Sequence, residues 1–428
     1  MSRSSFASPN LAALSLAALL AAGLAAQAPA PAQTTAPTNN TGPVAFTHAR
    51  LLPGGAPAIA DGVLVVHNGK ITALGGADTP IPEGAKVVDC RGKTITPGLI
   101  DASFRTAASL ADANEQGSEV TPQLRALDTL DPEDKLLARA RAAGVTAVHV
   151  MPGTRSVIGG LGCVVKTAGS EPRTMLLKED ASLRITMGAE PSMGNRAIRG
   201  GEVDSIYYRR PTTRMGVVWE VRRSFFDAKQ ALETTAGAPQ PADPGTVVLQ
   251  KVLQGQLTAV TTARSEQDLR TALRIADEFG YKTVLDEAQD AHLVLDEIQA
   301  AKTTVLLGAP SATLVAGTGA QDGAEPRSAT VAMLAARGIP FVITTGTNLQ
   351  ALDLVREAMF ATRNGLTQAQ ALDAVTLEPA KLLGIADRTG SLQKGKDADF
   401  VVWSTDPLDP AAVAESVHID GISVLAPR

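Results

Sequence analysis

The chain is poor in aromatic, histidine and cysteine residues. Only 3% of its 428 residues are aromatic, five are histidine and two are cysteine. Cys90 and Cys163 each lie within an apolar segment without the spacing of a disulfide framework, so we expect buried free thiols. No two histidines have metal-ligand spacing. The sequence therefore lacks the local His and Cys motifs from which many metal sites are built.

A strong excess of charge of one sign and nucleotide-binding motifs are also missing. A net charge of −5 with mixed signs gives no electrostatic reason to expect nucleic acid or an anionic membrane as partner. The glycine-rich stretch 159–162 is followed by no G-K-[ST], which indicates a turn and not a phosphate loop. No G-x-S-x-G elbow surrounds Ser103, and no histidine is placed to serve it as a base, which disfavours a serine hydrolase.

The first residues have the pattern of an export signal. Arg3 supplies a positive charge, and Leu11–Ala26 is a run of apolar and small residues. Sixteen residues rise only about 24 Å as a helix, which is shorter than a ~30 Å hydrocarbon core. We therefore predict a cleaved signal over residues 1–28 and a flexible tether over 29–42. The mature protein is expected to be periplasmic or extracellular, without a membrane span.

Two β-rich ends enclose a middle that alternates strands and helices. Short strands with turns, including Asn68-Gly69, fill 43–96, and similar strands return in 386–428. Repeated β/α units with apolar strands fill 97–385, which indicates a (β/α)₈ TIM barrel. The predicted fold is this barrel with a small β-sandwich domain built from both chain ends. Sites of such barrels lie at the C-terminal ends of the strands, which here selects Ser103, Arg105, Lys166, Glu287 and Asn348.

Several segments resemble the amidohydrolase superfamily, in particular its imidazolonepropionase-like branch. "GKTITPGLIDA" is similar to the entry into the first barrel strand, and the segment from Ala371 to Leu408 is similar to the C-terminal signature. "VDCRGK" and "VHNGKITALG" resemble the β-sandwich strands. The resemblance implies metal-assisted hydrolysis of non-peptide C–N bonds, with zinc or another divalent ion activating a water molecule.

The ligand positions implied by the resemblance are not filled by the expected residues. Ser103 and Arg105 replace a His-x-His pair on strand 1, and Glu287 takes the histidine position on strand 6. Strand 5 offers only Thr261, Thr262 and Ala263, and Asn348 stands where strand 8 would carry an Asp base. Lys166 is a candidate for the strand 4 lysine, and Lys178 competes for that position.

These replacements predict a degenerate site without a cofactor. Hydroxyl groups are poor zinc ligands, and the charge of Arg105 repels a cation at this position. We expect Arg105 to pair with Glu287 or Asp286, and Lys166 with Glu287 is a second candidate pair. His149 is expected to be a hydrogen-bonded core residue. The predicted function is a non-catalytic binding or subunit-pairing protein. The alternative is an active hydrolase of small amide or cyclic amide C–N bonds with a rearranged site.

One segment combines arginine with aromatic residues. Residues 194–228 hold seven arginines and five of the fourteen aromatic residues. Arginine, tyrosine and tryptophan are typical of binding hot spots. The candidate contact residues for a ligand, a protein partner or a paralogous subunit are Arg209, Arg210 and Trp219. The competing interpretation is a long loop held by local ion pairs to Glu202, Asp204 and Glu220.

Overall fold

The computed structural model describes most of the chain after residue 41. The described ranges are 42–106, 112–115, 117–193, 195, 210–234, 243–308, 327–346 and 353–425. They all belong to one compact unit, Asn39–Arg428. The predicted signal and nearly all of the predicted tether lie outside these ranges. Within them, no helix combines the length and the apolar character that a membrane crossing requires.

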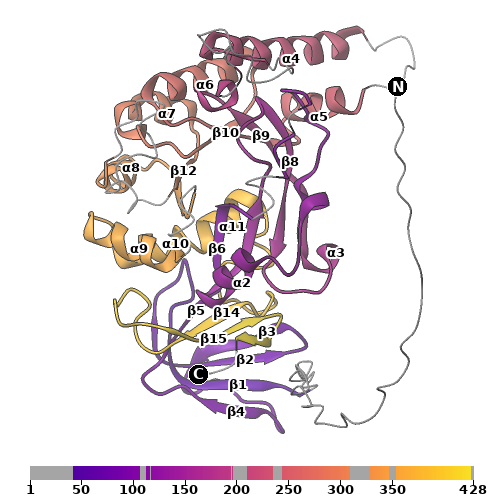
Figure 1. The fold of residues 1–428 in the computed structure, drawn as a ribbon. Helices are drawn as coiled ribbons and strands as arrows, with labels where there is room; N and C mark the ends of the chain where they lie inside the picture. Colours follow the sequence, from indigo (N-terminus) through magenta and orange to yellow (C-terminus); the bar gives the residue numbers. More distant parts are fainter. Residues whose placement is uncertain are drawn as a thin grey trace, which may run out of the picture. The chain divides into compact units, whose positions relative to one another are not determined.

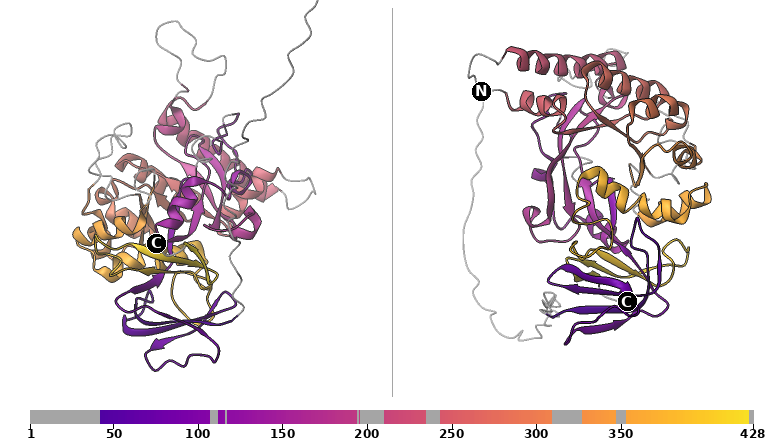
Figure 2. Two further views of the ribbon diagram at one scale, coloured as in Figure 1. Left: turned by 60° about the horizontal axis from the view of Figure 1, so that its bottom comes forward. Right: turned by 180° about the vertical axis from the view of Figure 1, so that it is seen from behind.

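The first sheet is assembled from both ends of the chain. Its eight strands follow the order β16-β15-β14-β5-β1-β2-β3, with β4 paired to β1. Antiparallel pairing of β14 with β5 joins the two ends, and Figures 1 and 2 show the N-terminal strands in indigo beside the C-terminal strands in yellow. The strands are β1 (Val44–Leu51), β2 (Ile59–His67), β3 (Lys70–Gly76), β4 (Lys86–Asp89), β5 (Thr94–Pro97), β14 (Phe400–Trp403), β15 (Ala414–Ile419) and β16 (Ile422–Leu425).

The predicted hairpin turn joins β2 and β3. Asn68 and Gly69 have φ angles of 47° and 75°. A tight two-residue hairpin loop needs this left-handed geometry at both positions, and Asn and Gly adopt it at the lowest cost. The turn prediction is therefore confirmed.

The second sheet carries the alternating β/α part of the chain. Its order is β13-β12-β11-β10-β9-β8-β7-β6. The two ends of this order approach each other, because the backbone N–H of Thr345, just after β13, donates to Asp101 on β6 (3.3 Å). The two sheets fit a TIM barrel with a small β-sandwich domain. The strands are β6 (Leu99–Phe104), β7 (Val145–Val150), β8 (Ile158–Lys166), β9 (Leu176–Thr186), β10 (Thr258–Thr262), β11 (Thr283–Asp286), β12 (Val305–Gly308) and β13 (Phe341–Thr344).

Strand β8 departs from an all-parallel arrangement. It runs antiparallel to both β7 and β9, whereas β9 to β13 are mutually parallel. Lys166, its last residue, is therefore level with Ala147 near the start of β7. The expectation that Lys166 ends a parallel strand at the site is wrong for this reason.

The helices follow the apolar periodicity of the sequence. Helix α6 begins after Ser265, whose side chain accepts from the Asp268 N–H, and ends at Gly280 with φ of 74°, as predicted. The helices are α2 (Lys135–Ala142), α3 (Pro172–Met175), α4 (Arg214–Thr234), α5 (Pro244–Leu253), α6 (Glu266–Phe279), α7 (Leu295–Ala301), α8 (Thr330–Ala336), α9 (Leu354–Arg363), α10 (Gln368–Asp373) and α11 (Leu377–Leu383), with 3-10 turns η1 (Ala126–Thr129), η2 (Glu190–Ser192) and η4 (Ala291–Leu293).

An ion cluster with a buried centre (Lys166, Asp397 and Asp399) and an exposed rim joins the two sheets. The Lys166 ammonium group contacts Asp397 (2.8 Å), Asp399 (3.0 Å) and Asp420 (2.7 Å), which belong to the C-terminal segment around β14 and β15. Asp397 also pairs with Lys70 and Arg388. We call these six residues the seam cluster. Its three positive and three negative charges offset one another, which burial requires.

Candidate functional site

The C-terminal ends of β6, β9, β10 and β11 bring together a second set of charged side chains. In-register pairing places Thr186 of β9 beside Thr262 of β10, and Thr262 beside Asp286 of β11. Glu287 follows directly after β11, and Arg264 lies two residues after the end of β10. We call the following six residues the strand-end cluster: Arg105, Arg184, Glu190, Arg264, Asp286 and Glu287.

Glu287 is held by two arginines. Arg105 Nη2 lies 2.9 Å from Glu287 Oε1, and Arg264 Nε lies 2.6 Å from Glu287 Oε2. Arg264 Nη1 also lies 2.7 Å from Glu190 Oε2. Burial opposes ionisation of Glu287, but Arg264, Arg105 and Arg184 outweigh it and lower its pKa to about 2. The predicted pairing of Arg105 with Glu287 is confirmed.

The backbone at Glu287 is in an unusual conformation. Its φ angle is 54°, in the left-handed region that non-glycine residues seldom adopt. A strained residue of this kind costs about 1–3 kcal/mol and persists only when its surroundings fix it. The ion pairs with Arg105 and Arg264 supply such fixation at the end of β11.

Asp286 and Arg184 form the deeper part of the strand-end cluster. Arg184 Nη2 lies 3.0 Å from Asp286 Oδ2, and both side chains are almost fully buried. The Thr262 hydroxyl donates to the same oxygen at 3.3 Å. Burial lowers the pKa of Arg184 and raises that of Asp286, although their mutual attraction and a hydrogen bond from Ser103 favour the charged forms. Asp286 is thus already engaged by a guanidinium group and hydroxyls.

Asp101 lies between the first and last strands of the second sheet. Its carboxylate accepts from the Ser103 N–H (3.1 Å) and from the Thr345 hydroxyl (2.5 Å). Burial raises the pKa of Asp101 to about 6 despite these hydrogen bonds. This carboxyl group therefore titrates closer to neutral pH than an ordinary aspartate does.

His149 is a core residue, as predicted. Its Nδ1 lies 3.0 Å from the Ala102 carbonyl oxygen and its Nε2 lies 2.9 Å from the Ser182 hydroxyl. Burial lowers its pKa to about 4, so the ring is neutral at pH 7. Both ring nitrogens are occupied by protein groups.

The residues at the strand ends do not fit a divalent metal ion. Among the described residues, no group of three or more His, Cys, Asp or Glu side chains is arranged to hold one. The carboxylates of Asp286 and Glu287 are shared with Arg184, Arg105 and Arg264. At an effective dielectric of about 20, a guanidinium group 4 Å away repels a cation by about 4 kcal/mol per unit charge. The donor set thus suits arginine and not zinc.

The other predicted site residues divide into two groups. Ser103 lies at the end of β6 beside Asp286 and Asp101, as expected, whereas Lys166 lies in the seam cluster. Lys166 therefore pairs with aspartates of the C-terminal segment and not with Glu287. Lys178, the competing strand 4 lysine, donates to the Leu383 carbonyl (2.8 Å). Asn348 is outside the described residues.

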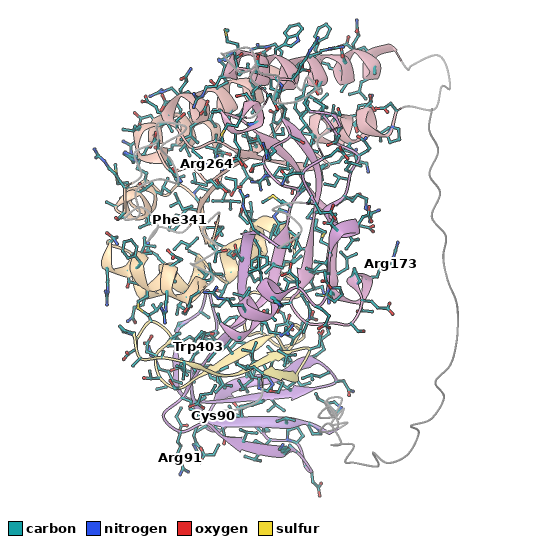
Figure 3. The ribbon with its side chains drawn as sticks, viewed as in Figure 1. Cys90, Arg91, Arg173, Arg264, Phe341 and Trp403 are labelled. Carbon is teal, nitrogen blue, oxygen red and sulfur yellow. The ribbon has the colours of Figure 1, made fainter. Side chains whose placement is uncertain are left out.

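The sequence reasoning missed Arg184, Arg264 and Glu190. Arg184 lies in the buried second half of β9, and Arg264 lies two residues after the end of β10. A charged residue inside a buried strand requires a partner, and this signal marked Arg184. Figure 3 labels Arg264 near the upper helices and Trp403 in the lower, composite sheet.

The arginine- and aromatic-rich segment contains a helix where a loop was expected. Arg209 is outside the described residues, Arg210 is exposed, and Trp219 lies on the 21-residue helix α4. Arg214 pairs with Asp268 of α6 (3.2 Å). Arg222 likewise pairs with Glu278 of α6 (2.7 Å), not with the acidic residues of its own segment. The competing interpretation is therefore wrong about a loop at residues 214–228, which are helical, although one local ion pair is present, between Arg223 and Asp227 (3.7 Å).

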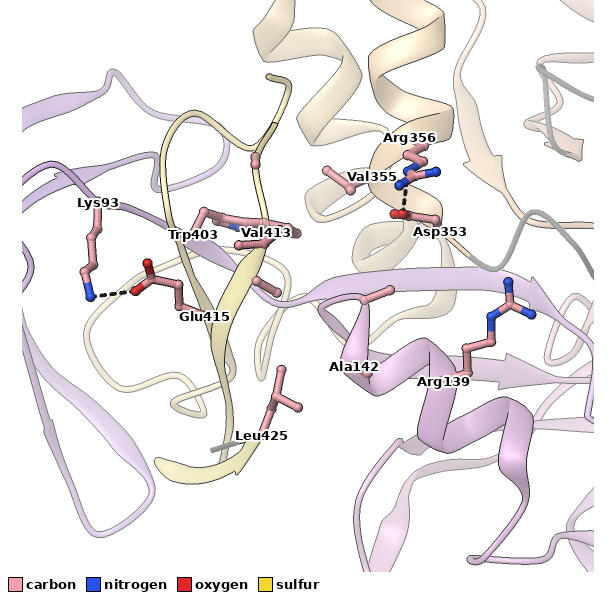
Figure 4. A pocket seen from close by; sticks show the side chains of 13 residues that line it. Lys93, Arg139, Ala142, Asp353, Val355, Arg356, Trp403, Val413, Glu415 and Leu425 are labelled. Atoms are coloured by element: carbon pink, nitrogen blue, oxygen red, sulfur yellow. Dashed lines mark ion pairs between the residues drawn. The ribbon is translucent and has the colours of Figure 1, made fainter. Parts of the chain in front are cut away.

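A separate hollow of about 660 Å³ lies between the composite sheet, α2 and α9. Figure 4 shows its two ion pairs, Lys93 with Glu415 (2.6 Å) and Arg356 with Asp353 (2.9 Å). Arg139 adds an electrostatic attraction to Asp353. The lining contains no member of the strand-end cluster, so this hollow is distinct from the candidate site.

Comparison with known proteins defines the class. Residues 280–423 match the model of the amidohydrolase family. The crystal structure of an amidohydrolase from Thermotoga maritima MSB8 is 30% identical with a TM-score of 0.80, over 90% of this chain and 100% of that chain. The chain therefore belongs to the amidohydrolase superfamily.

Curated relatives specify the branch. The imidazolonepropionase of Cupriavidus taiwanensis is 27% identical over 417 residues, which are 86% of this chain and 90% of that protein. The amidohydrolase tasK of Hapsidospora irregularis is 29% identical over 84% of this chain, but the chain spans only 39% of tasK. Within the superfamily, the chain belongs to the imidazolonepropionase-like branch.

Proposed function

We propose that this chain is an exported, non-catalytic member of the amidohydrolase superfamily that acts by binding a ligand, a protein partner or another subunit. The observation that carries the proposal is the strand-end cluster. Arg105, Arg184 and Arg264 hold the carboxylates of Asp286 and Glu287 at the strand ends. Within the described ranges, these ion pairs leave no set of basic ligands for an ion that would activate water.

Export is supported by the sequence alone. The apolar run Leu11–Ala26 behind Arg3 is too short to span a bilayer and ends in small residues, as a cleaved signal does. N-terminal sequencing of the exported protein is expected to begin after residues 25–28. A mature chain that begins at Met1 or Ser2 would contradict this part of the proposal.

A second candidate function is an active hydrolase of small amide or cyclic amide C–N bonds through a rearranged site. One observation favours it. Asp101, with a pKa raised to about 6, lies within hydrogen-bonding reach of the Ser103 backbone and next to the strand-end cluster. A buried carboxyl group that titrates near neutral pH is suited to proton transfer.

Metal content separates the two candidates from an ordinary amidohydrolase. The protein is purified from medium supplemented with zinc or manganese and analysed for bound elements, with Glu287→Ala as matched variant. We expect no stoichiometric divalent ion in either protein. One ion per chain that is lost in Glu287→Ala would overturn the non-catalytic proposal.

Activity separates the two candidates from each other. A panel of small amides, lactams and hydantoin-like rings is assayed with the wild type and with Asp101→Asn. Absence of turnover in both supports the binding function. Metal-independent turnover that disappears in Asp101→Asn, with the fold intact by circular dichroism, supports the second candidate instead.

A further inference from the structure

A second hollow, of about 510 Å³, lies between the composite sheet and helix α10. Loop 52–58, which follows β1, forms its walls together with the end of β5 and α10 (Figure 1). Small-molecule sites have volumes of about 300–1,000 Å³ and mainly apolar walls with a few polar groups, and this hollow has both properties. Its lining includes Leu52, Pro57, Leu372, Arg50, Asp373 and Asp406. We call it the α10 hollow.

Asp373, at the end of α10, is a carboxylate without a close cation. Its Oδ1 accepts from the Gly55 N–H at 3.1 Å, and within the described ranges no nitrogen of a lysine, arginine or histidine lies within 4 Å of either oxygen. Lys381 attracts it only from a distance and is itself 2.7 Å from Glu378, whose repulsion of Asp373 is larger. Burial raises the pKa of this half-buried carboxyl group. The ionised form has therefore lost part of its hydration without gaining a cation.

The other two charges of the α10 hollow neutralise each other. Arg50 Nη1 lies 2.6 Å from Asp406 Oδ2, so this arginine is already engaged. The lining therefore carries one negative charge more than positive charges. The hollow of about 660 Å³ beside α9 differs in this respect, because each of its two carboxylates has a cation at 2.6 or 2.9 Å. Of these two hollows, the α10 hollow is the one whose charge is not balanced by its own lining.

A carboxylate beside apolar walls favours a cation with an apolar body. An ammonium group donates charge-assisted hydrogen bonds to a carboxylate, which replace the water lost by burial. Leu52, Pro57 and Leu372 offer apolar surface against which a short hydrocarbon chain or ring is removed from water. Asp373 repels an anion, and a neutral molecule leaves the carboxylate without a compensating charge. The lining thus selects the chemical class of the ligand by charge and by polarity.

We propose that the α10 hollow binds a small organic ammonium ion, with the ammonium group on Asp373 and the hydrocarbon body against Leu52, Pro57 and Leu372. The lining contains no member of the strand-end cluster, so this site is separate from the candidate site and goes beyond the proposed function. It does not depend on whether the strand ends hold a metal ion or turn over a substrate. A protein that binds no ammonium ion would leave the metal and activity results unchanged, so the two proposals fail separately.

Calorimetric titration of the purified protein with n-hexylammonium, in a phosphate buffer free of amines, tests the proposal. We expect one saturable site per chain. The uncharged analogue n-hexanol is expected to bind at least about tenfold more weakly, and hexanoate is expected not to bind, because neither compensates the carboxylate. n-Butylammonium has two methylene groups fewer and is expected to bind about tenfold more weakly than n-hexylammonium, because each buried methylene strengthens binding about threefold to fourfold.

Asp373→Asn removes the charge and keeps the local contact, because an amide oxygen still accepts from the Gly55 N–H. We expect the affinity for n-hexylammonium to fall about tenfold, to the level of n-hexanol, without loss of thermal stability. Glu378→Gln is the matched control, because Glu378 is a neighbouring carboxylate that pairs with Lys381 and is not part of the lining. Glu287→Gln, in the strand-end cluster, is likewise expected to leave the affinity unchanged.

Three results would overturn the proposal. One is the absence of saturable n-hexylammonium binding to the folded wild type. Another is equal affinity of the wild type for n-hexylammonium and n-hexanol, which would mean that the hollow recognises only the apolar body; this comparison needs no variant. The third is an affinity that is unchanged in folded Asp373→Asn or reduced equally in Glu287→Gln, which would place the ammonium group away from Asp373.

Discussion

The seam cluster and the strand-end cluster have the same charge count but different partners. In each, three cations meet three carboxylates. The seam cluster joins β8 to the C-terminal segment of the composite sheet through Lys166. The strand-end cluster stays within the ends of β6 to β11 and the turn η2. The comparison teaches that buried carboxylates can be neutralised by a lysine or by arginines. In the seam cluster the lysine links two sheets. In the strand-end cluster the arginines lie where the family resemblance implies a metal ion.

The difference between the two clusters also explains which family motifs this chain carries. Asp397 and Asp399 lie in the C-terminal signature by which the chain resembles its family, and both contact Lys166. Their role is to hold the two sheets together, which a chain needs whether or not it is an enzyme. Membership of the family follows from such scaffold residues, whereas activity depends on the strand ends.

Replacing Lys166 by Met is expected to give the largest loss of stability. The change leaves Asp399 buried without its cation and removes one of three partners from Asp397. Removing one partner of a buried ion pair costs about 3–5 kcal/mol. Urea unfolding measures the loss, with Lys178→Met as control, because Lys178 donates to a neutral carbonyl oxygen, that of Leu383. Equal losses of stability in both variants would show that the ion pairs of Lys166 contribute no more than the hydrogen bond of Lys178.

Glu287→Gln is expected to cost somewhat less, because Arg264 keeps Glu190. Glu287 has its pKa lowered from 4.5 to about 2, a shift equivalent to about 3 kcal/mol. A depressed pKa means that this stability is present above pH 4.5 and is lost as the pH falls from 4.5 to 2. The stability difference between wild type and Glu287→Gln should therefore shrink over that range in acid titrations of unfolding. A difference independent of pH would contradict the role of the ionised carboxylate.

Local signals predicted the elements well. Ser265 and Gly280 bound α6, and Asn68-Gly69 forms the β2–β3 turn, because capping and left-handed geometry depend on neighbouring residues only. The composite sheet was also predictable, since both chain ends carry short strands with turns. The direction of β8 was not. Its residues are all buried, and a fully buried strand has the same apolar pattern in parallel and antiparallel sheets.

The candidate site was predictable in part. Arg105 with Glu287 followed from the cost of an unpaired buried charge. The contribution of Arg184 depends on the register of β9, β10 and β11, which sets it level with Val284, two residues before Asp286 and about a hundred residues later in the chain. No local pattern encodes that contact. Lys166 was misplaced for a related reason, since its partners lie more than two hundred residues away.

Restoring a histidine pair tests whether the arginines exclude a metal. The double variant Ser103→His/Arg105→His removes one guanidinium from Glu287 but keeps Arg184 and Arg264. We expect no stoichiometric zinc binding by calorimetry and a stability loss of about 2 kcal/mol, because Glu287 loses one of its two pairs. Tight zinc binding would show that Arg184 and Arg264 do not exclude a metal ion from the strand ends. The exclusion would then depend on the residues replaced in the variant, Arg105 above all.

Thr345→Val is expected to have a smaller effect. The change removes the hydroxyl that donates to the buried Asp101 carboxylate but leaves the backbone N–H. A hydrogen bond to a charged group contributes about 1.5–3 kcal/mol, and the remaining donors limit the net loss to the lower end of that range. Thr344→Val is the matched control, because its buried hydroxyl donates to a neutral carbonyl at a longer distance (3.4 Å). If Thr344→Val lost as much unfolding free energy as Thr345→Val, the hydrogen bond to Asp101 would not be the cause of the loss.

The smallest effect is expected for an ion pair outside both clusters. Arg337, at the end of α8, pairs with Asp296 of α7, and their side chains are 41% and 84% exposed. Water screens such a pair, so Arg337→Gln should change the free energy of unfolding by no more than about 0.5 kcal/mol, and by less in high salt. Chemical denaturation at low and high ionic strength measures this. A loss comparable to that of Glu287→Gln would mean that burial does not set the weight of an ion pair in this chain, and the comparison of the two clusters would lose its physical basis.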